Sequence, residues 1–159
     1  MSCAKPLVAL LQERGLSLSL AESLTGGLVA DEIVKVPGAS KMFSGSAVCY
    51  QESAKARVLK VKKSTLKKHG AVSAACAKEM ALNARKLFQT DIALSTTGYA
   101  GPDGKDVGLC YIGVAAQDKT LAFKLRLQAN RQYVRKFCAL IALHILYQQL
   151  NRKDIEHGS

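Results

Sequence analysis

Two short segments, each placed directly after an apolar stretch, constrain the fold of this chain more than any other feature. They have the sequences AESLTGG at residues 21–27 and TGYAGPDG at residues 97–104. Glycines and hydroxyl side chains at the end of a strand leave backbone N–H groups open to anions and polar ligands. The residues after Gly27 return to a helical pattern, so Ser23 and Thr25 are expected at the N-terminus of a helix. The sequence therefore predicts strands that lead into loops binding a small polar or phosphorylated ligand.

Strands and helices alternate along the chain until a final hairpin. Apolar residues spaced three and four apart predict helices, whereas short apolar or alternating stretches predict strands. The predicted helices are 4–13, a segment from after Thr25 to about 35, 53–59, 64–70, 73–88 and 130–149. The predicted strands are 16–21, 42–50, 91–97, 107–116 and 120–127. Ser64 and Asn130 are predicted to cap the helices that they precede.

This order of elements predicts a layered α/β fold with a mixed sheet. A chain of 159 residues has the length of one domain. We assign residues 1–150 to that domain and residues 151–159 to a disordered tail. The last predicted helix is apolar on nearly all sides, so it must be covered on more than one side. Either a packed layer of the same chain or a subunit interface would cover it.

The formal net charge is +11, and much of it comes from a basic cluster at residues 60–68. A surplus of this size can attract nucleic acid. However, no aromatic residues lie among these lysines and no known nucleic-acid-binding motif surrounds them, so a solvated helix face is the simpler interpretation. Weak, salt-sensitive binding follows from charge alone. We therefore do not expect nucleic acid as a functional partner.

The five cysteines are scattered along the chain and form no CxxC pair. An odd number without metal-ligand spacing predicts reduced, mostly buried thiols in a reducing compartment, and no metal site. No apolar stretch approaches the roughly 20 residues that span a bilayer. The N-terminus also lacks a signal-peptide pattern. We therefore expect a cytoplasmic protein that does not contact membranes.

Five motifs occur in a fixed order between about residue 7 and residue 150. They are AESxTGG, a strand that ends in tyrosine and is followed by AK, HGAVS, TGxAGPDG, and a helix that carries arginines. In this order they resemble the C-terminal domain of the competence/damage-inducible protein CinA, a family that includes stand-alone nicotinamide-nucleotide amidases. The resemblance implies a three-layer α/β/α fold, usually in a homo-oligomer. It also implies hydrolysis of the carboxamide of nicotinamide mononucleotide to nicotinate mononucleotide and ammonia, without a metal or other cofactor.

The resemblance implies catalytic roles for three residues. Ser23 falls on the family's serine and would be the nucleophile, while Lys55 falls on its lysine and would be the base. Such a base needs a lowered pKa, which we expect from burial and from nearby positive charge. Tyr50, at the end of the second strand, would pack on the pyridine ring or donate a hydrogen bond near it.

The remaining motif positions are expected to bind the substrate, and they fall into three groups. The donors expected to hold the carbonyl oxygen or the phosphate are Thr25, Gly26 and Gly27. The opposite wall of the site would be formed by Thr97, Gly98, Gly101 and Pro102. The guanidinium groups, of which at least one would bind the 5′-phosphate, are those of Arg131 and Arg135.

Each of these residues also has a purely structural interpretation. Taken alone, Ser23 is a helix cap, Lys55 is a solvated lysine on a helix, and Gly101 with Pro102 is a turn. Taken alone, the two arginines are an exposed pair one helical turn apart. Only the joint pattern favours an active site over these interpretations.

Three departures from the family pattern keep other functions open. Glu52 stands where asparagine is usual, and an acid there would raise the pKa of Lys55. The loop at residues 103–107 is short, and Leu109 stands where a hydroxyl residue is common. The main alternative to an amidase is therefore a catalytically inactive relative that binds a nucleotide or a similar ligand. A nucleic-acid-associated basic protein is a third possibility, supported by charge alone.

Overall fold

A five-stranded mixed sheet in the order β2-β1-β3-β4-β5 runs through the centre of the molecule. The computed structural model describes residues 2–152. Its strands are β1 (Leu18–Glu22), β2 (Phe43–Val48), β3 (Ile92–Gly98), β4 (Leu109–Ala115) and β5 (Thr120–Arg126). β1 pairs in parallel with β2 and β3, whereas β4 is antiparallel to both β3 and β5. The predicted hairpin is β4 and β5.

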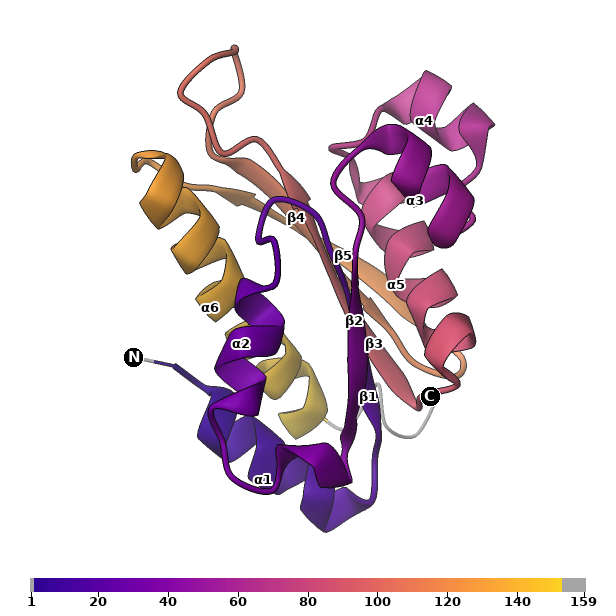
Figure 1. Cartoon of the computed structure of the whole chain (residues 1–159), viewed down its shortest axis with the longest axis vertical. Coiled ribbons are helices and arrows are strands. Elements are labelled where there is room, and N and C mark those ends of the chain that lie inside the picture. The colour runs from indigo at the N-terminus through magenta and orange to yellow at the C-terminus, as the bar shows by residue number, and fades with distance from the viewer. Residues whose placement is uncertain (1, 153–159) are drawn as a thin grey trace.

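Helices cover both faces of this sheet, as Figure 1 shows. One face carries α1 (Ala4–Arg14), α2 (Leu28–Val34) and α6 (Arg131–Asn151), with the short 3-10 helix η1 (Ala39–Lys41) after α2. The other face carries α3 (Glu52–Val58), α4 (Lys63–His69) and α5 (Ala74–Phe88). The predicted three-layer α/β/α fold with a mixed sheet is therefore confirmed.

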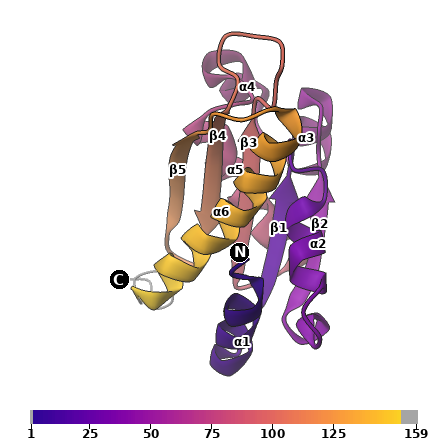
Figure 2. The same ribbon diagram turned by 90° about the vertical axis from the view of Figure 1, so that its left-hand side faces the viewer.

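The apolar residues gather in two cores, one on each face of the sheet. The larger core packs α1, α2 and α6 against the sheet, and the smaller one lies under α3 and α5. α6 runs obliquely across the sheet (Figure 2) and also contacts α1 and α2. A layer of the same chain thus covers most of the apolar surface of α6. Near its start, the rings of Tyr133 and Phe137 stack with centroids 5.7 Å apart and stay partly exposed.

Of the two predicted helix caps, the one at Asn130 is confirmed, and Ser73 caps α5 in the same way. The Ser73 side chain accepts a hydrogen bond from the Cys76 amide, and the Asn130 side chain accepts one from the Tyr133 amide, each at 3.1 Å. These bonds satisfy amides that would otherwise lack partners in the first turns of α5 and α6.

The predicted cap at Ser64 is wrong. α4 begins at Lys63, so Ser64 already lies within the helix. The Lys62 amide donates to the Glu79 carboxylate of α5 at 3.1 Å, and Lys62, two residues before the predicted cap, is the residue that caps α4. A contact between two helices has therefore overridden the local capping preference.

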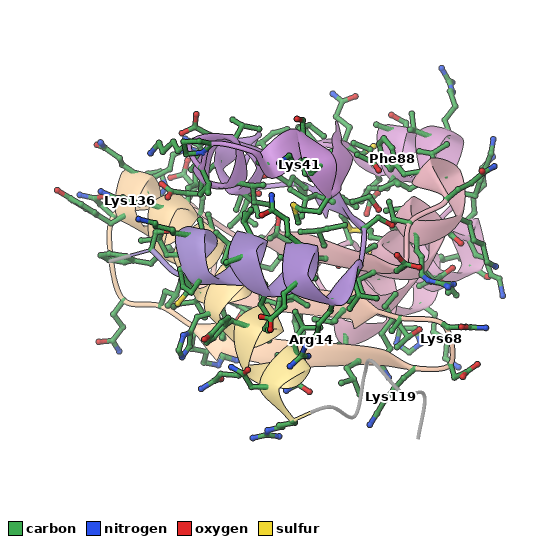
Figure 3. All side chains as sticks on the ribbon, turned by 90° about the horizontal axis from the view of Figure 1, so that it is seen from below. Arg14, Lys41, Lys68, Phe88, Lys119 and Lys136 are labelled. Carbon is green, nitrogen blue, oxygen red and sulfur yellow. The ribbon has the colours of Figure 1, made fainter. Side chains whose placement is uncertain are left out.

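The end of α6 lies slightly beyond its predicted end. Leu150 is fully buried, and its carbonyl accepts a hydrogen bond from Arg14 Nη1 of α1 at 2.8 Å, where Figure 3 shows Arg14 close to the last turns of α6. The helix therefore continues to Asn151, into the segment predicted as a tail. Residues 153–159 of that segment lie outside the described residues.

The five cysteines are all free thiols, and four of them are buried. This agrees with the expectation of reduced and mostly buried thiols. Within residues 2–152, no helix has both the length and the apolar character needed to cross a bilayer.

Candidate active site

The candidate site lies where the three parallel strands end. Because β2, β1 and β3 run in the same direction, their carboxyl ends meet at one edge of the sheet, where ligands bind in open α/β folds. A pocket of about 240 Å³ opens there. Its lining residues are Ser23, Leu24, Tyr50, Lys55, Ala71, Val72, Thr97, Gly98, Tyr99 and Ala100.

Ser23 and Lys55, which the sequence places 32 positions apart, meet in this pocket. Ser23 follows β1 directly, and its amide donates to the Thr96 carbonyl at 3.1 Å. Lys55 lies on α3, which starts shortly after β2, so its side chain reaches back to the end of the sheet. Lys55 Nζ lies 2.8 Å from Ser23 Oγ. Ser23 is 6% exposed and Lys55 is 2% exposed, so the pair is almost fully shielded while Ser23 still lines the pocket.

Two carbonyl groups complete the surroundings of the Lys55 amine. Nζ lies 3.0 Å from the Cys49 carbonyl oxygen and 3.1 Å from the Tyr50 carbonyl oxygen. A neutral amine has two hydrogens and one lone pair. If the hydrogens are donated to the two carbonyls, the lone pair is left for the Ser23 hydroxyl proton. The arrangement therefore suits an amine that takes a proton from Ser23.

Burial lowers the pKa of Lys55 below its ordinary value of 10.5, because the charged form loses hydration. The neighbouring groups Cys76, Cys49 and Glu52 act in the opposite direction, in that order of size. Glu52 thus has the effect expected from the sequence, although it is the smallest of the three. The nearby positive charge expected to help lower this pKa does not contribute to the shift among residues 2–152. Burial is the cause of the shift.

Glu22 is the residue that the sequence analysis missed. It is buried at the end of β1, and its carboxylate accepts five hydrogen bonds of 2.7–3.2 Å. The donors are the hydroxyls of Thr25 and Ser46 and the amides of Gly27, Val29 and Ala30. Glu22 therefore ties β2 and the start of α2 to the loop that carries Ser23. The available signal was an acid at the end of a strand whose other residues all suit a buried position.

The first glycine loop is held by the protein itself. The Gly27 amide donates to Glu22, and the Gly26 amide donates to the Ser23 carbonyl at 3.1 Å. The Thr25 hydroxyl contacts Glu22 and, at 2.8 Å, the Thr96 hydroxyl. None of Thr25, Gly26 and Gly27 lines the pocket. Gly26 and Gly27 have φ values of 56° and 103°, which delay the start of α2 to Leu28.

The two arginines expected at the phosphate lie behind and beside the pocket rather than in its lining. Arg135 is half-buried, and it donates from Nε to the Leu24 carbonyl at 2.8 Å and from Nη2 to the Thr25 carbonyl at 3.3 Å. Arg131 is exposed and donates to the Gly101 carbonyl and, at 2.8 Å, to the Tyr50 hydroxyl. Arg135 therefore holds the loop that carries Ser23. Arg131 joins the end of β2 to the loop after β3.

The second glycine loop supplies one wall of the pocket. Thr97 and Gly98 line it, and the Thr97 hydroxyl donates to the Ala71 carbonyl at 2.7 Å. Gly101 and Pro102 are joined by a cis peptide bond and lie outside the lining. The predicted opposite wall is therefore made by the first half of the motif.

Tyr50 lines the pocket, and the residue is 59% exposed. Its carbonyl contacts Lys55 and its hydroxyl contacts Arg131, so it hydrogen-bonds to both sides of the entrance. Neither contact joins its hydroxyl to Ser23. Its position suits a wall that packs on a ligand.

The lysines of the basic cluster are exposed, and none of them lines the pocket. Figure 3 shows that Lys68 of this cluster, Lys119 and Lys136 lie on different sides of the molecule. Among residues 2–152, no group of three or more histidine, cysteine, aspartate or glutamate residues is placed to hold a metal ion.

Comparison with known proteins gives consistent matches over nearly the whole chain. The chain is 49% identical over 154 residues to a relative from Caldanaerobacter subterraneus subsp. tengcongensis named competence-damage inducible, covering 94% of this chain and 37% of that protein. It is 44% identical to a CinA-like protein from Fusobacterium nucleatum, covering 90% of this chain and 36% of that protein. The chain thus spans little more than a third of the length of the curated relatives it matches.

Solved structures agree with the sequence relatives. A CinA superfamily protein from Klebsiella pneumoniae superposes with a TM-score of 0.91 at 28% identity, covering 94% of this chain and 96% of that chain. A competence/damage-inducible protein from Agrobacterium tumefaciens gives a TM-score of 0.88 at 32% identity, covering 91% and 92% of the two chains. Residues 1–150 match the family model of the CinA C-terminal domain. The chain therefore belongs to the CinA C-terminal domain family.

Proposed function

We propose that this protein is an amidohydrolase that converts nicotinamide mononucleotide into nicotinate mononucleotide and ammonia. The observation that carries the proposal is the buried contact of 2.8 Å between Lys55 Nζ and Ser23 Oγ. Hydrolysis of an amide by a serine requires a base within hydrogen-bond reach of the hydroxyl, and a lysine can act as that base only when its pKa is lowered. Both conditions are met at one edge of the sheet.

The proposed reaction has two stages. Ser23 Oγ attacks the carboxamide carbon while its proton passes to the neutral Lys55 amine, which gives a tetrahedral intermediate. Lys55 then returns the proton to the departing nitrogen, and ammonia leaves an ester on Ser23. A water molecule gives a proton to Lys55 and attacks this ester, and Lys55 passes that proton to the departing Ser23 Oγ. The acid released ionises to the carboxylate, and the serine and the neutral amine are restored.

The negative oxygen of the tetrahedral intermediate needs a donor in the pocket. Leu24 follows Ser23 and lines the pocket, and its amide donates to no acceptor within residues 2–152. We assign the oxyanion to this amide. The amides of Gly26 and Gly27, which the sequence suggested for this purpose, already have acceptors in the protein.

The size of the pocket suits part of a nucleotide. Its volume of about 240 Å³ is below the roughly 300–1,000 Å³ of pockets that enclose a whole drug-sized ligand. The pyridine ring and its carboxamide would occupy it, with the ribose and phosphate extending outward. Arg131 lies exposed beside the mouth and has further N–H groups for the phosphate.

A specific observation also supports the alternative of an inactive relative that binds a nucleotide. Three acceptors surround Lys55 Nζ, and three is the number that a charged ammonium needs. If Lys55 keeps its proton at neutral pH, the same contacts stabilise the fold and Ser23 is not activated. The two functions differ in the protonation of one amine.

The test is release of ammonia from nicotinamide mononucleotide over a range of pH, with calorimetric binding measured on the same samples. Ser23→Ala and Lys55→Met should each lower the rate at least about 10³-fold, as loss of a nucleophile or its base does. Ser44→Ala and Lys68→Met serve as controls, because both residues are exposed and lie outside the pocket lining. Binding without ammonia at any pH would support the inactive relative, and ammonia release that survives Ser23→Ala would exclude the mechanism.

A further inference from the structure

Two tyrosines line the pocket from different strands, and only Tyr50 figured among the expected site residues. Tyr50 follows β2, whereas Tyr99 follows β3. They are 59% and 46% exposed, so both stay accessible to a ligand. In the sheet β1 lies between β2 and β3, so Ser23 at the end of β1 is flanked by one tyrosine on each side.

The strand spacing sets the distance between the two flanks. Neighbouring strands lie roughly 4.8 Å apart, so β2 and β3 are separated by roughly 9.6 Å. Two aromatic rings that pack on each other have centroids about 4.5–7 Å apart, so a ring held between two others needs walls roughly 9–14 Å apart. The strand order thus separates the residues that follow β2 and β3 by roughly the width that a flat ring held between two others needs.

The backbone of Tyr99 is held on both sides. Its amide donates to the Leu109 carbonyl at 2.9 Å, and its carbonyl accepts from the Gly108 amide at 2.8 Å. Next to it, a Cβ on Gly98 would lie 2.7 Å from Cys110 Sγ, so this position has no room for a side chain. Tyr99 is thus the first large side chain after Thr97 on this rim. On the other rim, Arg131 fixes the Tyr50 hydroxyl.

From these observations we infer that Tyr50 and Tyr99 form the two walls of a slot over Ser23, and that Tyr99 determines specificity for a flat, positively charged aromatic ring. This inference rests on the proposed function and adds the residue that selects the ring of the ligand. A pyridinium ring is flat and carries a positive charge, and the faces of tyrosine rings attract both properties. An uncharged, non-aromatic ring of the same size gains much less from these walls.

The experiment compares nicotinamide mononucleotide with its reduced, dihydropyridine form, which keeps the ribose phosphate and the carboxamide. Dissociation constants are measured by calorimetry in the Ser23→Ala background, where no turnover occurs. Tyr99→Ala should weaken binding of the oxidised nucleotide about 5- to 30-fold, which corresponds to loss of one stacking and cation–π partner. It should change binding of the reduced form less than about threefold, because that form lacks the ring charge.

Three further variants separate the contribution of the Tyr99 aromatic face from those of side-chain bulk and of folding. Tyr99→Phe keeps the aromatic face and should preserve the ratio of the two affinities within about twofold. Tyr99→Leu keeps apolar bulk without that aromatic face and should abolish the preference for the oxidised over the reduced nucleotide. It covers the case in which the alanine variant folds poorly. Tyr133→Ala is the matched control, since Tyr133 is equally exposed at 46% but lies on α6 outside the pocket lining.

The outcomes distinguish this inference from the proposed function. A preference for the oxidised ring that depends on Tyr99 supports the slot even if the wild-type protein releases no ammonia, in which case the amidase proposal alone fails. If the wild-type protein releases ammonia but the ratio of affinities for the oxidised and reduced nucleotides is the same with and without Tyr99→Ala or Tyr99→Leu, the slot alone is overturned. Failure of both nucleotides to bind at millimolar concentration also overturns the slot.

Discussion

Replacement of Glu22 by glutamine should destabilise the protein, and the hydrogen bonds predict by how much. Oε1 accepts from three donors and Oε2 from the Ala30 amide and the Ser46 hydroxyl, so the new NH₂ group fits best at Oε2. The Ser46 hydroxyl can rotate and accept a bond, whereas the Ala30 amide is left without an acceptor. An unpaired buried donor costs about 1–3 kcal/mol, and loss of the negative charge near the start of a helix adds about 0.3–1 kcal/mol. We therefore expect a loss of roughly 1–4 kcal/mol in the free energy of unfolding.

Urea unfolding followed by circular dichroism measures this difference. For a domain of this size, the loss corresponds to a fall in Tm of roughly 2–16 °C. Glu13→Gln, an exposed acid on α1, removes the same charge and should change the stability by less than about 0.5 kcal/mol. If Glu22→Gln is as stable as Glu13→Gln, the five contacts do not hold the loop, and the account of the first glycine loop is wrong.

Three other predictions concern the pH dependence, the backbone and the loop that carries Ser23. Because burial lowers the pKa of folded Lys55 below 10.5, the unfolded chain binds more protons above that folded pKa, so stability should rise with pH up to about 10.5. Lys55→Met should abolish this rise in urea titrations, and a rise of the same size in the variant would assign it to other groups. Gly108→Ala should lower the stability by several kcal/mol more than Gly104→Ala, because both have positive φ but only at Gly108 would a Cβ overlap a neighbouring carbonyl. Arg135→Met should lower kcat about 10- to 100-fold by releasing the Ser23 loop, with Lys136→Met as the exposed neighbouring control; equal rates in the two variants would remove Arg135 from the mechanism.

The sequence was sufficient to predict the architecture because the elements that define it are local. Apolar periodicity gave the strands and helices, and glycine marked where β1 and β3 end. The caps at Ser73 and Asn130 depend on residues three positions away, which a sequence displays directly. The cap at Ser64 failed because the start of α4 depends on Glu79, which is distant in sequence.

The chemistry of the site could be predicted only in part, for the same reason. The motifs point to Ser23 and Lys55, but the burial that lowers the pKa of Lys55 involves groups distant in the sequence, such as Ser23 and Cys76. The role of Glu22 depends on donors up to 24 residues away. Likewise, nothing local to Arg135 indicates that its guanidinium contacts the carbonyl of Leu24, 111 positions earlier.

β2 is an edge strand, so the ability of the Lys55 amine to act as a base depends on how firmly this edge of the sheet stays paired. β2 has a neighbouring strand on one side only, and the two carbonyls that contact Lys55 follow it directly in the chain. A marginal strand opens more readily than a central one, and opening here admits water to the amine. Hydration restores the ordinary basicity of the amine, so that it captures a proton and stops serving as a base. Hydrogen exchange at the amides of β2 and the residues after it is thus expected to slow when a ligand fills the pocket. A variant that weakens the pairing of this edge strand would lose turnover before it loses its global fold.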